Sequence, residues 1–168
     1  KSFDIEVVLS KNYLPNNYVS KSYELNDRHG FFFRKKVGLF EVTNGKKIKI
    51  TKFHNAQSEE IENALLNFPI AICMSQRGEF VLHASCVRLN NKTLLFSGPS
   101  HSGKSTLASY LHSRGAEIIS EDISVINLKG SPKIYTYCPF IKLSKEAASF
   151  AKLSKSKRRY LLKKDRCG

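Results

Sequence analysis

Residues 98–105 hold the most specific chemical signal in the chain, a phosphate-binding loop. They read Gly-Pro-Ser-His-Ser-Gly-Lys-Ser, which is the Walker A pattern of a glycine, four residues and then Gly-Lys-Ser. The backbone N–H groups of such a loop, together with the N terminus of the helix that follows, face the phosphates of a nucleotide. The sequence therefore predicts that ATP is bound by Gly98, Ser100, His101, Ser102, Gly103, Lys104, Ser105 and Thr106.

Two residues of this loop have expected individual roles. Lys104 is expected to reach the β- and γ-phosphates, and the Ser105 hydroxyl is expected to bind Mg²⁺. His101 stands at a variable position of the pattern, so its side chain is expected near the phosphates without being required. The alternative interpretation of the motif is an ordinary glycine-rich turn between a strand and a helix.

The flanking residues favour the phosphate-binding interpretation. Thr93 to Phe96 is an apolar run that predicts a strand, and Ser105 to Arg114 predicts a helix that stops at Gly115. Upstream, Phe80–Leu89 and Lys92–Phe96 flank Asn90-Asn91 and predict a β-hairpin that leads into the loop. In common mononucleotide kinases the loop follows a strand of a parallel sheet, so a variant architecture is expected.

Two adjacent acids follow the next predicted strand, Glu117 to Ser120. A carboxylate at the end of a strand beside a phosphate-binding loop can accept a hydroxyl proton or bind a metal ion. Glu121 and Asp122 are therefore candidate catalytic residues. The alternatives are a surface glutamate at 121 and a turn-capping aspartate at 122. His83, on the hairpin, is either an active-site residue or a hydrogen-bonded core histidine.

In this order of features the sequence resembles the catalytic domain of the HPr kinase/phosphorylase family. The shared features are a hairpin carrying a His, a P-loop, a helix ending in Arg-Gly, and a strand ending in two acids. The family includes serine kinases that modify peptide natural products such as lasso peptides. The resemblance covers Phe80 to Leu143. It implies an α/β fold with a P-loop kinase core of the HPr kinase and phosphoenolpyruvate carboxykinase type.

The resemblance also implies roles for individual residues. His83 falls where the family has an active-site His, and Lys104, Ser105 and Thr106 fall on its P-loop. Glu121 falls on the acid that takes the proton from the acceptor serine. Asp122 falls on the acid that helps to hold Mg²⁺.

The sequence departs from the family pattern in three ways. Glu121 replaces the usual first Asp, and its extra methylene changes the reach of a base. Ala84 replaces the Gly that follows the His in the HPr enzymes. The family continues for several more strands and helices, so the kinase domain is expected to be incomplete at its C-terminal end. HPr as the substrate and the reverse phosphorylase reaction are therefore not carried over.

The residues before the hairpin predict a small β-rich region and then helices. Strands are expected at 3–9, 31–34, 37–42 and 46–50, with a hairpin turn at Asn44-Gly45. Lys46, Lys47 and Lys49 are expected at an edge or on the solvent face. Ser58 is expected to cap a helix, and 70–74 to form a second, mostly buried one. The predicted division is an accessory region at 1–56 and a kinase domain at 57–168.

Composition and charge limit the class of protein. The 168 residues are 41% hydrophobic, which suits a folded domain, and no apolar run approaches the length of a membrane span. The four scattered cysteines, Cys73, Cys86, Cys138 and Cys167, form no Cys-x-x-Cys pair, which favours a reducing cytoplasm over zinc or disulfides. The net charge of +14 gathers around Arg34 to Lys52 and in Lys142 to Arg166. Without a nucleic-acid motif, we interpret it as a solvated surface.

These observations together predict an ATP- and Mg²⁺-dependent cytoplasmic kinase that transfers the γ-phosphate to a hydroxyl, most simply a serine of a peptide or small protein. The HPr enzymes form hexamers, so the resemblance implies a homo-oligomer. One alternative is a small-molecule kinase on the same scaffold. The other is a non-catalytic ATP-sensing interaction module. The acidic pair distinguishes an enzyme from such a module, because a sensor needs no base.

Overall fold

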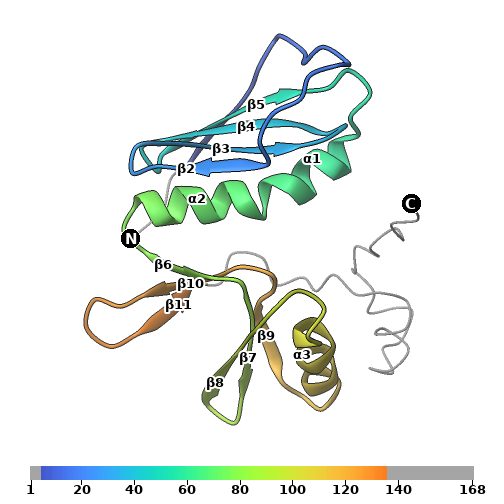
Figure 1. Ribbon diagram of the computed structural model, residues 1–168. Coiled ribbons are helices and arrows are strands. Elements are labelled where there is room, and N and C mark those ends of the chain that lie inside the picture. Colours follow the sequence, from blue (N-terminus) through green and yellow to red (C-terminus); the bar gives the residue numbers. More distant parts are fainter. Residues whose placement is uncertain (1–4, 136–168) are drawn as a thin grey trace. The chain divides into compact units, whose positions relative to one another are not determined.

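The computed structural model describes residues 5–135, and the chain divides into two compact units, Lys1–Val81 and Leu82–Gly168 (Figure 1). Within the described residues the structure is mixed α/β, with strands forming three sheets. The basic stretch from Lys142 to Arg166 and the cysteines at 138 and 167 lie outside the described residues. The two units are therefore presented separately.

The first unit is built on a five-stranded sheet in the order β1-β5-β4-β3-β2. Its first strand pairs in parallel with β5, and the other neighbours are antiparallel. Of these strands, only β2 is absent from the sequence prediction. The strands are β1 (Glu6–Leu9), β2 (Tyr23–Leu25), β3 (His29–Arg34), β4 (Gly38–Thr43) and β5 (Lys47–Lys52).

The hairpin turn predicted at Asn44-Gly45 is confirmed. Both residues have positive φ, 53° and 61°, and the Lys46 N–H donates to the Thr43 carbonyl at 3.0 Å. Two consecutive positive φ values form the tight turn whose twist matches that of paired strands, and Asn-Gly adopts them readily. The turn fixes the register of β4 against β5, in which Val42 lies opposite Ile48.

Alternation along β4 and β5 separates a buried face from a solvent face. Phe40, Val42, Ile48 and Ile50 are buried and form one core with residues of two helices. Lys47 and Lys49 point to the other face, as the sequence predicted. There the Lys47 ammonium lies 3.3 Å from the Glu6 carboxylate, and that of Lys49 lies 3.0 Å from Glu41.

Two helices cover the buried face of this sheet: α1 (Ser58–Leu65) and α2 (Phe68–Gln76). Pro69 stands in the first turn of α2, where its missing N–H costs little. Ala64, Ile72 and Cys73 of these helices belong to the core of the first sheet. The sequence placed the division of the chain between residues 56 and 57, with both helices in the kinase domain. In the structure α1 and α2 instead belong to the first unit, because they form its core together with the sheet.

The end of α2 is bonded to the hairpin turn. The Gly45 N–H donates to the Gln76 side-chain carbonyl at 2.7 Å, and the Arg77 guanidinium donates to the Gly45 carbonyl. Gln76 also donates to the Asn26 carbonyl at 3.0 Å. A Cβ at Gly45 would lie 2.8 Å from Arg77 Cγ and 2.9 Å from the Cys73 carbonyl oxygen. Close approach and positive φ together require glycine here.

In the part that the structure describes, the second unit contains two small sheets and one helix, and its strand β6 begins just before the boundary at Leu82. One sheet has the order β8-β7-β9, and the other has the order β11-β10-β6. The elements are β6 (Phe80–Leu82), β7 (Ala84–Leu89), β8 (Lys92–Ser97), α3 (Lys104–Ser113), β9 (Glu117–Ser120), β10 (Ser124–Asn127) and β11 (Lys133–Tyr135). The short strand β11 is absent from the sequence prediction.

The P-loop helix packs on the sheet that leads into it. Val87 of β7, Ala108 of α3 and Ala116 form the buried cluster between them. The predicted hairpin is present as β7 and β8, joined at Asn90-Asn91 with positive φ at both residues. The strand predicted over 80–89 is not continuous, however. It breaks at His83, because β6 and β7 pair in different sheets.

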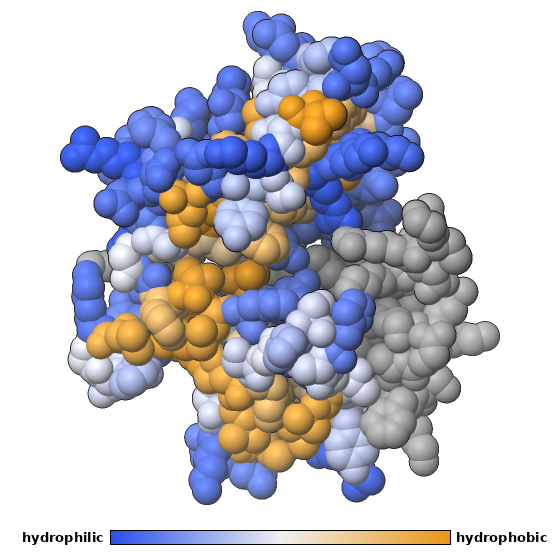
Figure 2. All heavy atoms as spheres, in the orientation of Figure 1, coloured by the Kyte–Doolittle hydropathy of each residue, from blue (hydrophilic) through white to orange (hydrophobic). Residues whose placement is uncertain are grey.

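On the face shown in Figure 2, hydrophobic side chains gather over the second unit. Large hydrophobic residues exposed in that unit include Leu94 on β8 and Leu107 and Tyr110 on α3. Among the described residues, no helix has the length and apolar character needed to cross a membrane.

The bonded turn at Gly45 generates a stability prediction. Gly45→Ala should lower the free energy of unfolding by roughly 2–5 kcal/mol, the sum of a left-handed backbone penalty and forced overpacking. Gly78→Ala is the matched control, since Gly78 also has positive φ (75°) but open space where a Cβ would stand. It should cost only about 1–2 kcal/mol. Urea unfolding of the full chain measures both, and equal losses would contradict the steric argument.

The buried cysteine of β7 generates a prediction about pH. Burial raises the pKa of the Cys86 thiol to about 11, above its ordinary value of 9.0. Folding therefore favours the neutral thiol over the thiolate. The resulting gain in the free energy of unfolding is complete below the unfolded-state pKa of 9.0 and is lost as the pH rises through the folded-state pKa of about 11. The fall in unfolding free energy between these pH values should be steeper in the native chain than in Cys86→Ala. Identical slopes in urea titrations would refute the assignment.

Candidate functional site

The P-loop connects the end of β8 to the start of α3, as the sequence predicts. Residues 98–103 form the loop, in which His101 and Gly103 have positive φ, 66° and 88°. Left-handed residues in a turn let successive backbone N–H groups converge on one point, which makes an anion-binding concavity. Gly103 immediately precedes the first residue of α3, so the N terminus of the helix adds its positive dipole end to the same concavity.

Lys104 lies back along this loop. Its ammonium donates to the carbonyl oxygens of Gly98 at 2.9 Å and of Pro99 at 2.8 Å. These contacts hold the charged end of the side chain beside the loop. A phosphate bound in the loop would thus meet a cation that is already positioned.

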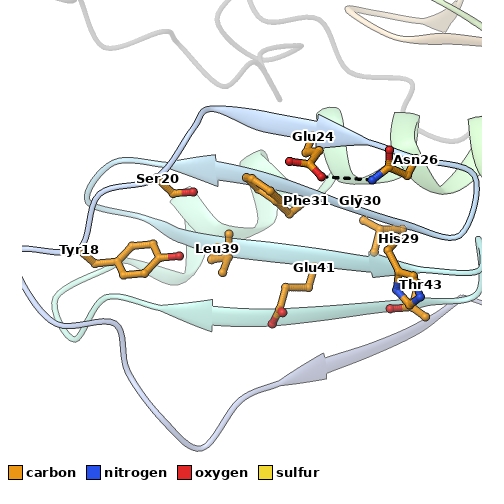
Figure 3. Close-up of a pocket in the computed structure, with 11 residues that line it drawn as sticks. Tyr18, Ser20, Glu24, Asn26, His29, Gly30, Phe31, Leu39, Glu41 and Thr43 are labelled. Carbon is orange, nitrogen blue, oxygen red and sulfur yellow. Dashed lines mark hydrogen bonds between the residues drawn. The ribbon is translucent and has the colours of Figure 1, made fainter.

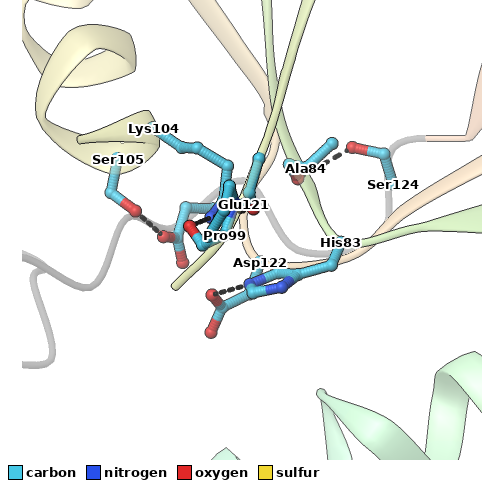
Figure 4. Close-up of polar contacts among 9 residues, drawn as sticks. His83, Ala84, Pro99, Lys104, Ser105, Glu121, Asp122 and Ser124 are labelled. Carbon is cyan, nitrogen blue, oxygen red and sulfur yellow. Dashed lines mark hydrogen bonds and ion pairs between the residues drawn. The ribbon is translucent and has the colours of Figure 1, made fainter. Parts of the chain in front are cut away.

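Ser105 and Glu121 are brought together, although they are far apart in the sequence. The Ser105 hydroxyl donates to a Glu121 carboxylate oxygen at 2.5 Å, and Figure 4 shows the two side chains pointing toward one another. Only 6% of Glu121 is exposed. The first turn of α3 and the end of β9 therefore meet through a hydroxyl and a nearly buried carboxylate.

A β-bulge in β9 explains why Glu121 points toward α3. Val87 lies opposite Ile118, but Cys86 lies opposite Ser120, so Ile119 is an extra residue on β9. Side chains alternate between faces, and one extra residue reverses every position after it. Because Val87 faces α3, the bulge places Ser120 on the opposite face and turns Glu121 toward the helix.

The next residue, Asp122, is turned in a different direction. Its φ is 65°, and the Ile123 N–H donates to the Glu121 carbonyl at 2.7 Å, which closes a three-residue turn around it. Turns of this kind with a positive central φ are rare and strained. Such backbone conformations cost about 1–3 kcal/mol and persist where surrounding contacts enforce them.

Asp122 faces His83. One Asp122 carboxylate oxygen lies 3.6 Å from His83 Nε2, and the side chains are 35% and 52% exposed, respectively (Figure 4). His83 stands at the break between β6 and β7 and is therefore not a core histidine of a half-buried strand. The structure thus groups the predicted residues into two couples, Ser105 with Glu121 and His83 with Asp122.

The remaining predicted residues lie on the loop and the first turn of the helix. Ser100, His101 and Ser102 are exposed, and Thr106 is half-buried in α3. Two other histidines make local contacts that need no functional role. His54 Nδ1 lies 3.2 Å from the Asn55 side chain, and His112 Nδ1 lies 2.8 Å from the Ala116 carbonyl oxygen.

Two serines that flank the acidic pair were not among the predicted site residues. Ser120 and Ser124 are fully buried, and their hydroxyl oxygens are 2.7 Å apart. The Ser124 hydroxyl donates to the Ala84 carbonyl at 3.0 Å. The signal available in the sequence is a polar residue on each side of the acids within otherwise apolar strands.

The chemistry of the donor atoms fits Mg²⁺ bound with a nucleotide. Mg²⁺ is held in proteins by one or two carboxylates together with phosphate oxygens, and it prefers hard oxygen ligands. Ser105 and Glu121 supply a hydroxyl and a carboxylate beside the P-loop. In the part of the chain that the structure describes, no three His, Cys, Asp or Glu side chains form a set that could hold a metal ion alone.

A separate pocket of about 230 Å³ lies on the solvent face of the first sheet (Figure 3). Its lining includes Phe31 and two glutamates, Glu24 and Glu41, and none of the predicted site residues. Each glutamate already has a lysine near it, Lys21 at 3.5 Å and Lys49 at 3.0 Å.

Comparison with protein families, with curated proteins and with solved structures found no match to this chain.

Proposed function

We propose that the second unit is the catalytic part of a cytoplasmic kinase of the HPr kinase type. It would bind ATP with Mg²⁺ and transfer the γ-phosphate to a hydroxyl, most simply that of a serine in a peptide or small protein. The observation that carries the proposal is the contact of the P-loop serine with the acidic pair, Ser105 with Glu121 at 2.5 Å. A glycine-rich turn without a nucleotide function has no need of a nearly buried carboxylate at this position.

The binding role falls on the loop and the residues that follow it. Backbone N–H groups of 98–103 and the N terminus of α3 would bind the phosphates. Lys104 would exchange its bonds to the Gly98 and Pro99 carbonyls for phosphate oxygens. Bound Mg²⁺ would neutralise charge that develops on the transferred group.

The contacts favour a division of labour between the acids that reverses the family-based expectation. Glu121 is nearly buried and bonded to Ser105, the residue expected to bind the metal, so we assign Glu121 to the Mg²⁺ side of the site. Asp122 is half-exposed and pairs with His83, so we assign this couple to the acceptor hydroxyl. A carboxylate that receives a proton must be reachable by the acceptor, and Asp122 meets this requirement better than Glu121 does.

The P-loop assignment predicts the effect of removing the lysine. Lys104→Ala should weaken binding of ATP by about 1.5–3 kcal/mol in the presence of Mg²⁺, because a charge-assisted phosphate contact is lost. Calorimetric titration of the full chain measures the affinity. Lys92→Ala, which removes the same charge from the exposed surface of β8, is the control and should bind as the native chain does. Unchanged affinity in Lys104→Ala would end the P-loop assignment.

The division of labour predicts that neutralising the two acids has different effects. Glu121→Gln should weaken the Mg²⁺-dependent part of ATP binding roughly 10- to 100-fold, because an amide is a poor ligand for a hard cation. Asp122→Asn should leave that affinity nearly unchanged. It should slow single-turnover phosphate transfer by roughly 10²–10⁴-fold, the usual contribution of a positioned base.

These measurements use calorimetry with Mg²⁺ and ATP, and transfer from labelled ATP to a degenerate peptide pool with a fixed central serine. If the two variants exchange their effects, the family-based roles of the acids hold instead. Binding of ATP without transfer to peptides, small alcohols or water would support the ATP-sensing module. Transfer to small alcohols alone would support a small-molecule kinase.

A further inference from the structure

The strained turn at Asp122 lies between two buried serines that bond to each other. Ser120, the last residue of β9, and Ser124, the first of β10, have no exposed surface. Their hydroxyl oxygens are 2.7 Å apart, so the chain before and after the acidic pair is closed by a side-chain bond. The bond joins the two ends of a segment that contains only Glu121, Asp122 and Ile123.

The direction of these hydrogen bonds follows from the number of protons. A serine hydroxyl has one proton to donate. Since the Ser124 hydroxyl donates to the Ala84 carbonyl at 3.0 Å, its oxygen must accept the proton of Ser120. The result is a buried relay from Ser120 through Ser124 to Ala84, which connects β9, β10 and β7. Figure 4 shows its last bond, from Ser124 to Ala84.

This relay ends beside the histidine that faces Asp122. Ala84 directly follows His83, so the same two hydroxyls fix the backbone on which His83 stands and the turn that carries Asp122. The His83 and Asp122 side chains are 52% and 35% exposed, so burial does not set the 3.6 Å distance between His83 Nε2 and the Asp122 carboxylate oxygen. The separation depends on where their backbones are held.

We propose that Ser124, with Ser120, is a positioning residue that sets the His83–Asp122 couple for proton transfer from the acceptor hydroxyl; the catalytic half of this statement rests on the proposed function. If the bonds of Ser120 and Ser124 served only to pair buried polar groups, we would expect each buried hydroxyl of this unit to have a partner. In this unit the hydroxyl of Ser85, on the neighbouring residue of β7, is also buried but has no hydrogen-bond partner among the residues that the structure describes. Ser85→Ala is therefore a matched control that removes a buried hydroxyl without breaking a bond.

The test measures the couple directly, without nucleotide. In the full chain labelled with ¹³C-histidine, the His83 ring resonance is identified among the five histidines by its loss in His83→Gln. Asp122→Asn should shift this resonance in the native background and in Ser85→Ala. In Ser124→Ala the shift should fall to less than half, and Ser124→Thr, which restores a hydroxyl, should recover it. If the shift caused by Asp122→Asn is unchanged in Ser124→Ala, the positioning role is overturned.

A second variant covers the case in which Ser124→Ala does not fold. Ser120→Ala removes one end of the relay and keeps the Ser124 bond to Ala84, and it should also reduce the response of His83 to Asp122→Asn. A full response in a folded Ser120→Ala would likewise overturn the proposal.

A kinetic measurement on the same variants separates this proposal from the proposed function. Ser124→Ala should slow single-turnover phosphate transfer by roughly 10- to 100-fold, the cost of a misplaced catalytic group, and leave Mg²⁺·ATP affinity unchanged. Equal loss of transfer in Ser85→Ala would assign the effect to general destabilisation and overturn the positioning role. If the native chain transfers no phosphate but the resonance results hold, the kinase function fails and the relay stands.

Discussion

The second unit depends on one hydrogen bond, from the Ser105 hydroxyl to the Glu121 carboxylate. It joins the first turn of α3 to the end of β9, two elements that otherwise meet through a small apolar cluster around Val87, Ala108 and Ala116. A nearly buried carboxylate is costly unless charge-assisted bonds satisfy it. The contact therefore pairs the Glu121 carboxylate and holds the end of β9 against α3.

Two adjacent acids can perform different tasks only if the backbone turns them apart. The bulge at Ile119 turns Glu121 toward α3, and the positive φ of Asp122 accompanies the turn of the next carboxylate toward His83. Different environments then separate their chemistry, with one acid nearly buried and the other half-exposed. The cost of the strained turn is offset by the buried hydroxyl bonds that flank it.

The features that the sequence predicted are those determined by local residues. The Asn44-Gly45 turn and the P-loop with its strand and helix follow from residue types within a few positions. The cap predicted at Ser58 is wrong, because Ser58 is the first residue of α1 and Gln57 is its N-cap. The bulge at Ile119, the break at His83 and the relay through Ser124 depend on which strands pair, and no local pattern encodes this. The helices α1 and α2 were assigned to the wrong side of the division for the same reason. Their apolar faces were recognised, but the sequence does not say which sheet they cover.

The bulge in β9 has a consequence for how this region tolerates change in evolution and in mutagenesis. Exchanging Ile119 for another apolar residue would alter packing and leave the direction of the strand end intact. Deleting Ile119 would restore regular pairing, because Ile118 would remain opposite Val87 and Ser120 opposite Cys86. Glu121 would then still face α3, since it follows Ser120 by one position. The direction of Glu121 therefore depends on Ser120 keeping its place opposite Cys86, and the bulged residue itself can be exchanged or lost without reversing it.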